Sequence, residues 1–343
     1  MIIDFEQRNT SHCETGVVLN VMNFYGFLYS EPMIFGISSG LFFVYMPLFR
    51  GDRGVPLVGF RTFPGTIINN AFKSFKVKIG TKRFFSFQKD KAMQEMDELL
   101  AQGIPVCNKV GMYFLSYMPL QLREHWNIHN FCVIGKEGNE YIVSESLYGI
   151  KRISYENLKK VRFSSGRLKP RGKMYWVKEK PTSIPDIRTL IIKGIKKTCR
   201  NMVGIYGIPM ASYLGVRGIV KLSKYIRNLE EKLGQKAPVL LAKMIRYLEE
   251  LSTGGAGYRY IFGAFLFEAA EVLEKPKLKE YSVEINRIGN LWREFAIEGG
   301  RKLKNRNSVS YNELADRLLI IAAAEKKFFV ALRKEKLEYI PDN

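Results

Sequence analysis

The spacing of apolar residues divides the chain near residue 180. Before this point, helical spacing alternates with short strand-like runs, whereas the rest of the chain is helical almost throughout. The first part predicts helices at 15–25, 90–102 and 154–161. It predicts strands at 106–110, 113–117, 130–135 and 140–144, with a hairpin turn at 136–139. These elements indicate a domain of mixed α and β structure with antiparallel strands.

A proline-rich segment marks the change of pattern. Pro181 and Pro185 lie close together and are typical of a linker or a domain entry. Beyond them, the pattern predicts helices at 186–203, 211–233, 237–252, 257–273, 277–298 and 310–335. Two glycine pairs, Gly254 with Gly255 and Gly299 with Gly300, separate some of these helices. We therefore expect an α+β domain at residues 1–180 and an all-α domain at residues 181–343.

Composition places the chain among folded globular proteins. Of its 343 residues, 46% are hydrophobic and 25% are charged, which excludes the disordered and low-complexity classes. The longest uncharged stretch, residues 32–49, contains glycines, serines and Pro47. A membrane-spanning helix needs about 20 predominantly apolar residues. We interpret this stretch as buried, glycine-rich core.

The chain is strongly basic, with a formal net charge of +21. Residues 1–180 carry +10 and residues 181–343 carry +11, so the excess is not confined to a tail. Such a charge favours an acidic partner, which could be nucleic acid, an anionic membrane, a phosphorylated ligand or an acidic protein. Aromatic residues lie in core-like runs such as Phe84 and Phe85 and are not interleaved with the basic residues, which makes nucleic acid a weak candidate.

Cys13 is a candidate nucleophile because it directly precedes the first predicted helix. The helix dipole and the unsatisfied N–H groups at this position favour the thiolate form. The alternative is an inert, buried cysteine, which is what most free cysteines are. The four cysteines form no CxxC pair and only three histidines are present, so we expect no metal site. Unpaired cysteines and the lack of a secretory signal pattern favour a cytoplasmic location.

His129 and Glu145 strengthen the case for Cys13. His129 begins one strand of the predicted hairpin and Glu145 ends the other, so the antiparallel pairing brings them to the same edge. Thiolate, histidine and carboxylate together form a nucleophile, a base and a group that orients the base. Taken singly, each residue has an equally good structural interpretation: His129 as a structural histidine, and Glu145 as a solvated charge in a turn.

Three further residues compete for roles in this site. Gln7, six residues before Cys13, is a candidate donor to an oxyanion, together with the Cys13 backbone N–H. His12 and His125 compete with His129 as bases. His12 adjoins the nucleophile, but neighbouring side chains usually point in different directions, and we rank both below His129.

Several stretches of the chain resemble the butirosin biosynthesis protein H family. The stretches that resemble its N-terminal domain are 12–15, 23–26, 30–45 and 129–149. Residues 253–259 and 265–270 resemble the helical domain that often follows it. The resemblance implies a papain-like fold, with Cys13 as nucleophile and His129 as base. The acidic position of the family is usually Asp before Pro, whereas here Glu145 precedes a serine; Ser144 is the weaker alternative.

The resemblance also implies an activity. The best-known member of the family moves an aminoacyl group from a carrier-protein thioester to an amine of an aminoglycoside. We accordingly expect a cysteine-dependent acyltransferase of secondary metabolism that forms a Cys13 acyl-enzyme. The donor would be a carrier-protein phosphopantetheine thioester or a coenzyme A thioester, with no tightly bound cofactor. A chain with a charge of +21 would repel a cationic aminoglycoside, so the acceptor amine stays open.

An acidic acyl carrier protein would suit a basic stretch close to the expected site. That stretch, residues 151–173, contains nine basic residues and one acid, Glu156. The nine are Lys151, Arg152, Lys159, Lys160, Arg162, Arg167, Lys169, Arg171 and Lys173. The basic helix expected at 186–203 would allow peripheral contact with an anionic membrane. The alternative functions are a cysteine peptidase or amidase with the same triad, and a non-catalytic basic binding module.

Overall fold

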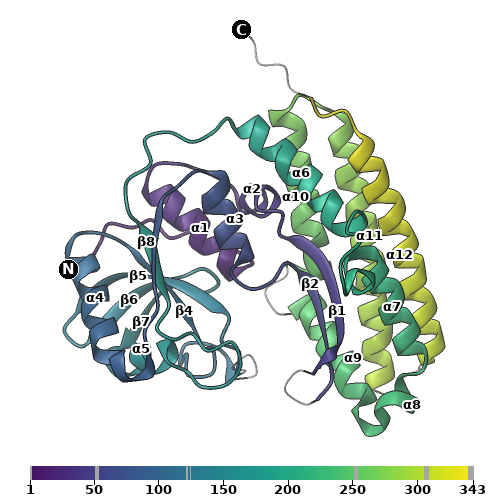
Figure 1. Ribbon diagram of the computed structural model, residues 1–343, viewed down its shortest axis with the longest axis horizontal. Helices are drawn as coiled ribbons and strands as arrows, with labels where there is room; N and C mark the ends of the chain where they lie inside the picture. The colour runs from purple at the N-terminus through teal and green to yellow at the C-terminus, as the bar shows by residue number, and fades with distance from the viewer. Residues whose placement is uncertain are drawn as a thin grey trace. The chain divides into compact units, whose positions relative to one another are not determined.

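The computed structural model describes residues 2–50, 54–120, 123, 125–250, 254–304 and 309–338, and Figure 1 draws it as a ribbon. Its internal contacts divide the chain into two compact units. The first comprises Met1–Ile34 and Pro64–Pro185, and the second comprises Phe35–Phe63 and Asp186–Asn343. This division differs from the expected boundary at residue 180, because the second unit begins at 186 and also takes in residues 35–63.

An antiparallel sheet of six strands lies at the centre of the first unit, in the order β3-β8-β4-β5-β6-β7. The strands are β3 (Ile79–Lys82), β4 (Val106–Val110), β5 (His129–Glu137), β6 (Glu140–Glu145), β7 (Gly149–Ser154) and β8 (Met174–Val177). β5 and β6 form the expected hairpin, and Gly138 supplies a positive φ of 56° in its turn. Because Cys132 pairs with Ser144, the start of β5 and the end of β6 meet at one edge.

Helices cover both faces of this sheet (Figure 1). They are α1 (Cys13–Phe24), α3 (Thr66–Ser74), α4 (Lys89–Ala101), α5 (Tyr155–Arg162) and the short η1 (Ser86–Gln88). Asn108 of β4 contacts Met96 of α4, whereas the neighbouring Cys107 lies near Tyr25 at the end of α1. Since adjacent strand residues point to opposite faces, α1 and α4 pack on opposite sides. Another helix, α2 (Glu31–Ile37), spans the division between the units.

The sequence pattern located most, but not all, of these elements. The helices expected at 15–25, 90–102 and 154–161 are α1, α4 and α5, and Ser154 caps α5 by accepting a hydrogen bond from Asn157 N at 3.3 Å. The prediction of a strand at 113–117 is wrong. That segment forms turns, in which Leu115 N donates to Met112 O and Met118 N donates to Leu115 O, both at 3.1 Å. The buried apolar residues here are Met112, Leu115 and Met118, which recur at every third position and not at every second position as in a strand.

The second unit combines a strand pair with helices. β1 (Leu41–Arg50) pairs antiparallel with β2 (Pro56–Arg61). Residues 32–49, expected to be buried core, form most of α2 and β1, and they are largely buried except near the end of β1, where Leu48 is 82% exposed. Trp292 packs against Phe43 and Phe60, with ring centroids 5.9 and 5.3 Å apart. The strand pair thus contributes to the core of the helical unit.

The longer helices of this unit are α6 (Ile187–Val203), α7 (Gly215–Arg227), α8 (Leu229–Leu233), α9 (Ala237–Ile245), α10 (Arg259–Val272), α11 (Lys277–Leu303) and α12 (Tyr311–Lys334). Short helical turns are η3 (Ala211–Tyr213), η4 (Gly234–Lys236), η5 (Arg246–Glu250) and η6 (Ala256–Tyr258). The prediction that Gly299 and Gly300 separate two helices is wrong, because α11 continues through both residues. A Cβ on Gly299 would lie 3.1 Å from Leu241, so glycine permits close packing against α9.

The expected class, an α+β region with antiparallel strands followed by a helical region, is confirmed. None of the helices in the described part of the chain combines the length and the apolar composition required to cross a membrane.

Candidate active site

Cys13 is the first residue of α1, and 7% of its surface is exposed. The carboxylate of Glu31, on α2, fixes the turn that leads into this helix. It accepts hydrogen bonds from the backbone N–H groups of Ser11 at 2.8 Å and His12 at 2.9 Å, and from the Thr15 hydroxyl at 2.7 Å. A carboxylate is also stabilised by the positive end of a helix dipole. The sequence pattern gave no indication of this role for Glu31.

The segment that precedes α1 lies along the β5–β6 hairpin. Ile3 N donates to Ile134 O at 2.8 Å, and Thr10 N donates to Ser146 O at 2.7 Å. Gly16, in the first turn of α1, approaches Ser146 so closely that a Cβ on it would lie 2.4 Å from the serine Cβ. We call residues 2–10 the N-terminal strap. The strap and Gly16 together hold the start of α1 beside the end of β6.

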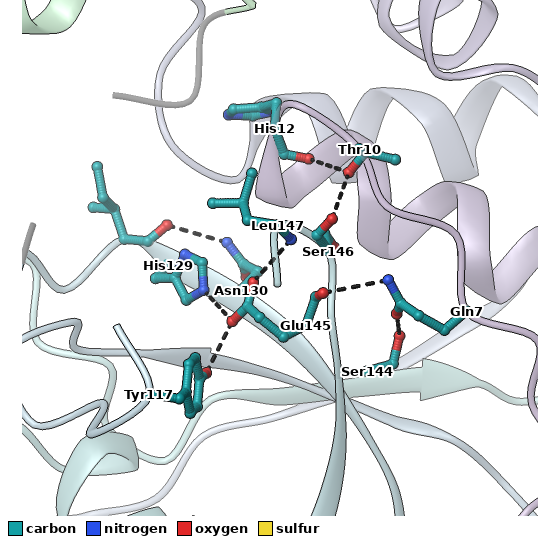
Figure 2. A network of polar contacts seen from close by, with 11 residues as sticks. Gln7, Thr10, His12, Tyr117, His129, Asn130, Ser144, Glu145, Ser146 and Leu147 are labelled. Carbon is teal, nitrogen blue, oxygen red and sulfur yellow. Dashed lines mark hydrogen bonds and ion pairs between the residues drawn. The ribbon is translucent and has the colours of Figure 1, made fainter. Parts of the chain in front are cut away.

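His129 and Glu145 form a buried pair at the edge of the sheet (Figure 2). His129 Nε2 lies 2.7 Å from Glu145 Oε2, and the two side chains are 3% and 0% exposed. Leu147 N also donates to Glu145 Oε1 at 3.3 Å. The hairpin register brings the pair together across 16 positions of sequence, as the strand pattern predicted. Glu145 therefore holds the imidazole through Nε2.

Cys13 completes a three-residue cluster, because its side chain acts on the pKa of His129 and therefore lies close to the imidazole. Since Nε2 is engaged by Glu145, Nδ1 is the nitrogen left for the sulfur. Burial lowers the pKa of His129, but the Glu145 charge and the hydrogen bonds with Cys13 and Glu145 outweigh this effect and raise the pKa from 6.5 to about 10. The thiolate charge of Cys13 acts in the same direction. The imidazole is thus held as an imidazolium beside Glu145 and Cys13.

Tyr117 is a further member of the cluster that the sequence did not indicate. Its hydroxyl donates to Glu145 Oε2 at 2.9 Å. Burial, the Glu145 charge and this hydrogen bond raise the pKa of Tyr117 well above its ordinary value. Tyr117 therefore stays protonated and remains a donor. The turns at 112–118, where a strand was expected, allow the hydroxyl to reach the carboxylate.

Gln7 lies near the cluster but is turned toward other partners. Its Nε2 donates to Arg8 O at 3.0 Å, Asn9 Oδ1 at 3.1 Å and Glu145 O at 3.3 Å. An amide has two hydrogens, so this arrangement engages both of them. Ser144 donates to Gln7 Oε1 and not to His129, as Figure 2 also shows. In this conformation Gln7 stabilises the end of β6, and its oxyanion role stays a prediction.

The two other histidines lie elsewhere. His12 is buried at the N-cap of α1, where its backbone carbonyl accepts from Thr10 and Thr15. Figure 2 shows its ring apart from the pair formed by His129 and its acid. His125 stacks on Tyr113 with ring centroids 3.9 Å apart. Among the three histidines, His129 is the one that contacts Glu145.

Basic residues lie next to the start of α1. Lys109 of β4 donates its backbone N–H to Lys173 O at 3.0 Å, and Lys109 pairs with Asn130, the residue after His129. Burial, together with the charge of Arg83, lowers the pKa of both lysines, and Glu14 partly opposes this shift. Glu14 follows Cys13 directly. Lys109 and Lys173 therefore lie within electrostatic range of the residue next to the nucleophile, and Arg83 lies within range of both lysines.

The basic stretch at 151–173 does not form one solvated surface. Arg162 is fully buried and donates to Ala92 O at 2.9 Å. Lys159 pairs with Asp90, whose pKa this contact lowers. Of the others, Lys151 and Lys173 are half-buried, and the remaining five are exposed. The expected docking surface therefore contains fewer than the nine cations counted in the sequence.

Two family models match the chain. The model described as Butirosin biosynthesis protein H, N-terminal matches residues 12–146 and covers every member of the Cys13, His129 and Glu145 cluster. The model described as Domain of unknown function (DUF4872) matches residues 156–332, slightly more than half of the chain. A search of curated proteins found no significant match. The chain therefore carries a region that matches the N-terminal domain of butirosin biosynthesis protein H and, over more than half of its length, belongs to the DUF4872 family.

Proposed function

We propose that this protein is a cysteine-dependent acyltransferase with a papain-like first unit. The observation that carries the proposal is the buried pair of His129 and Glu145, with His129 Nε2 2.7 Å from the acid, together with the electrostatic influence of Cys13 on His129. A cysteine at a helix start and a histidine with its acid on an antiparallel hairpin supply a nucleophile, a base and a group that orients the base. The family is named for a protein of butirosin biosynthesis, which supports a role in secondary metabolism.

In the first half-reaction, the Cys13 thiolate attacks the carbonyl carbon of an acyl thioester. The bond between this carbon and the donor sulfur breaks, and His129 gives its proton to the departing thiolate. The acyl group is then held on Cys13 as a thioester, which is nearly equal in energy to the thioester of the donor. Backbone N–H groups at the start of α1 are donors for the transient oxyanion.

In the second half-reaction, an amine attacks the acyl-enzyme. Neutral His129 takes one amine proton, the bond between carbon and Cys13 sulfur breaks, and an amide forms. The ion pair of thiolate and imidazolium is restored. Glu145 and Tyr117 keep the imidazole in place through both steps. We leave the acceptor amine unassigned.

The proposed donor is a phosphopantetheine thioester, borne by an acidic acyl carrier protein or present in coenzyme A. Lys109 and Lys173 support this choice, because their charges act on Glu14, the residue after Cys13, and would attract a phosphate of the donor arm. We also propose a cytoplasmic location, in which the neighbouring sulfurs of Cys107 and Cys132, 3.3 Å apart, would stay reduced.

Intact-protein mass spectrometry tests the proposal. Incubation with a panel of acyl-carrier and acyl-coenzyme A thioesters is expected to add one acyl mass to the wild type and to Cys199→Ala, but not to Cys13→Ala. Cys199 is a suitable control because it is a buried free thiol of the second unit. Decay of the adduct to an amide when amines are added supports a transferase. Decay to free acid at a rate that no amine alters would identify a hydrolase, and absence of any adduct would contradict the proposed mechanism.

A further inference from the structure

Two phenylalanines of the first unit project into solvent from one short turn. Phe85 and Phe87, at η1, are 69% and 83% exposed. Their rings stack with centroids 5.6 Å apart and planes 2° apart. Phe84, next to them in sequence, is 4% exposed, so the run that looked like core is divided between core and surface. Side chains this exposed make little contact with their own fold, and exposed apolar patches mark interaction sites.

A second loop lies against this turn. Phe84 N donates to Arg171 O at 2.9 Å, which joins the two segments. The second loop presents Leu168, which is 62% exposed and has a φ of 53°. Lys109 Nζ donates to Leu168 O at 2.9 Å and holds the backbone in this conformation. We call the three exposed apolar residues the apolar tip: Phe85, Phe87 and Leu168.

Exposed cations flank the apolar tip on both loops. They are Arg83, Lys89, Lys169 and Arg171. Within the described ranges, no salt bridge neutralises these four. Nearby Lys82 and Lys159 differ, because Glu95 and Asp90 pair with them at 2.5 Å. The exposed apolar residues of the two joined loops thus lie next in sequence to exposed cations.

This combination fits an anionic lipid surface. Apolar side chains that project from a turn can enter the interfacial layer, while flanking lysines and arginines stay at the level of the headgroups. A protein partner that took the same residues would have to supply a matching pocket, whereas a lipid interface needs none. We propose that residues 83–89 and 167–171 attach this protein peripherally to membranes that contain anionic lipids. This inference does not depend on the proposed catalysis.

Vesicle binding and bromolipid quenching test this inference. The full-length Cys13→Ala protein is mixed with vesicles of phosphatidylcholine alone, or of equal parts phosphatidylcholine and phosphatidylglycerol, and sedimented. We expect binding to the anionic vesicles that weakens as salt rises. In Phe87→Trp, brominated acyl chains are expected to quench the added tryptophan more strongly than the three native tryptophans, measured in the parent protein. Sedimentation without this extra quenching would overturn insertion of the tip.

Matched variants separate the apolar and the electrostatic contributions. Phe85→Ser with Phe87→Ser is expected to lower the vesicle partition coefficient roughly tenfold or more. Leu28→Ser is the control, because Leu28 is a 66% exposed apolar residue of the same unit. Lys89→Gln and Lys169→Gln are each expected to lower partitioning about fivefold. Partitioning that is equal for all these variants, or binding of anionic polypeptides without binding of vesicles, would contradict the proposal.

Discussion

Replacement of Glu145 by glutamine removes one charge from the buried cluster with little change of shape. The carboxylate lies 2.7 Å from His129 Nε2 and is fully buried. In Glu145→Gln, the burial that lowers the pKa of His129 would be opposed mainly by Cys13. We therefore expect His129 to lose its proton near neutral pH in the variant, whereas it holds that proton up to about pH 10 in the wild type.

The free energy involved follows from the size of the shift. A rise of the His129 pKa from 6.5 to about 10 corresponds to roughly 5 kcal/mol of preference for the imidazolium. Loss of the Glu145 carboxylate, which orients His129 and favours its protonated form, is expected to slow acylation of Cys13 by roughly 10²- to 10⁴-fold. The decrease should exceed that of any substitution that affects donor binding alone.

Two measurements check this prediction. Rapid quenching followed by mass spectrometry gives the rate at which the acyl-enzyme forms, and NMR of the imidazole carbons follows the titration of His129, one of three histidines. Glu140→Gln is the matched control, since Glu140 is an exposed acid on the same strand. If Glu145→Gln kept both the acylation rate and the His129 titration of the wild type, the assigned role of Glu145 would be refuted.

The same shift predicts how stability depends on pH. Because the folded pKa of His129 exceeds the unfolded value of 6.5, the folded state holds a proton that the unfolded state releases between pH 6.5 and about 10. The stabilising contribution of His129 is complete below pH 6.5 and is lost as pH rises to about 10. Urea unfolding of Cys13→Ala, which removes the thiol proton from the balance, should show a decrease as pH rises above 6.5, and a smaller one when Glu145→Gln is added.

Three further substitutions test other contacts. Tyr117→Phe removes a hydrogen bond to the acid and should slow acylation about tenfold, or about 1.4 kcal/mol; an unchanged rate would show that Tyr117 has no positioning role. Glu325→Ala leaves the charge of Arg259 buried without its partner at 2.8 Å and should lower the free energy of unfolding by about 3–5 kcal/mol in urea. An unchanged urea midpoint would contradict this. Gly194→Ala would place a Cβ 2.5 Å from a backbone carbonyl of α2 and should cost about 1–3 kcal/mol. Gly300→Ala is its control, because it meets open space; equal melting temperatures for both variants would rule out crowding.

The sequence predicted the parts of the site that depend on local pattern. The helix after Cys13 and the hairpin that joins His129 to Glu145 follow from apolar spacing and a turn, and antiparallel geometry then brings the two ends together. Contacts formed by tertiary packing left no such signal. Glu31 reaches the start of α1 from another helix, and Tyr117 reaches the acid from irregular turns.

Two misreadings have clear physical causes. Phe84 and Phe85 are identical in type and adjacent, so hydrophobicity alone could not separate the buried ring from the exposed one. Gly299 sits inside a helix, where the lack of a side chain permits close packing against Leu241, and tertiary packing overrides the usual helix-breaking tendency of glycine. In both cases the deciding interaction is with a residue distant in sequence or with solvent.

The N-terminal strap has a consequence for how this protein would lose activity. The imidazole and its carboxylate share one hairpin, whereas the sulfur reaches them from a helix whose start is tied down by the bonds of Ile3 and Thr10 to that hairpin. Fraying of a few residues would therefore disconnect the nucleophile while the sheet stays intact. Inactivation by mild heat or urea should precede global unfolding and reverse on return to native conditions.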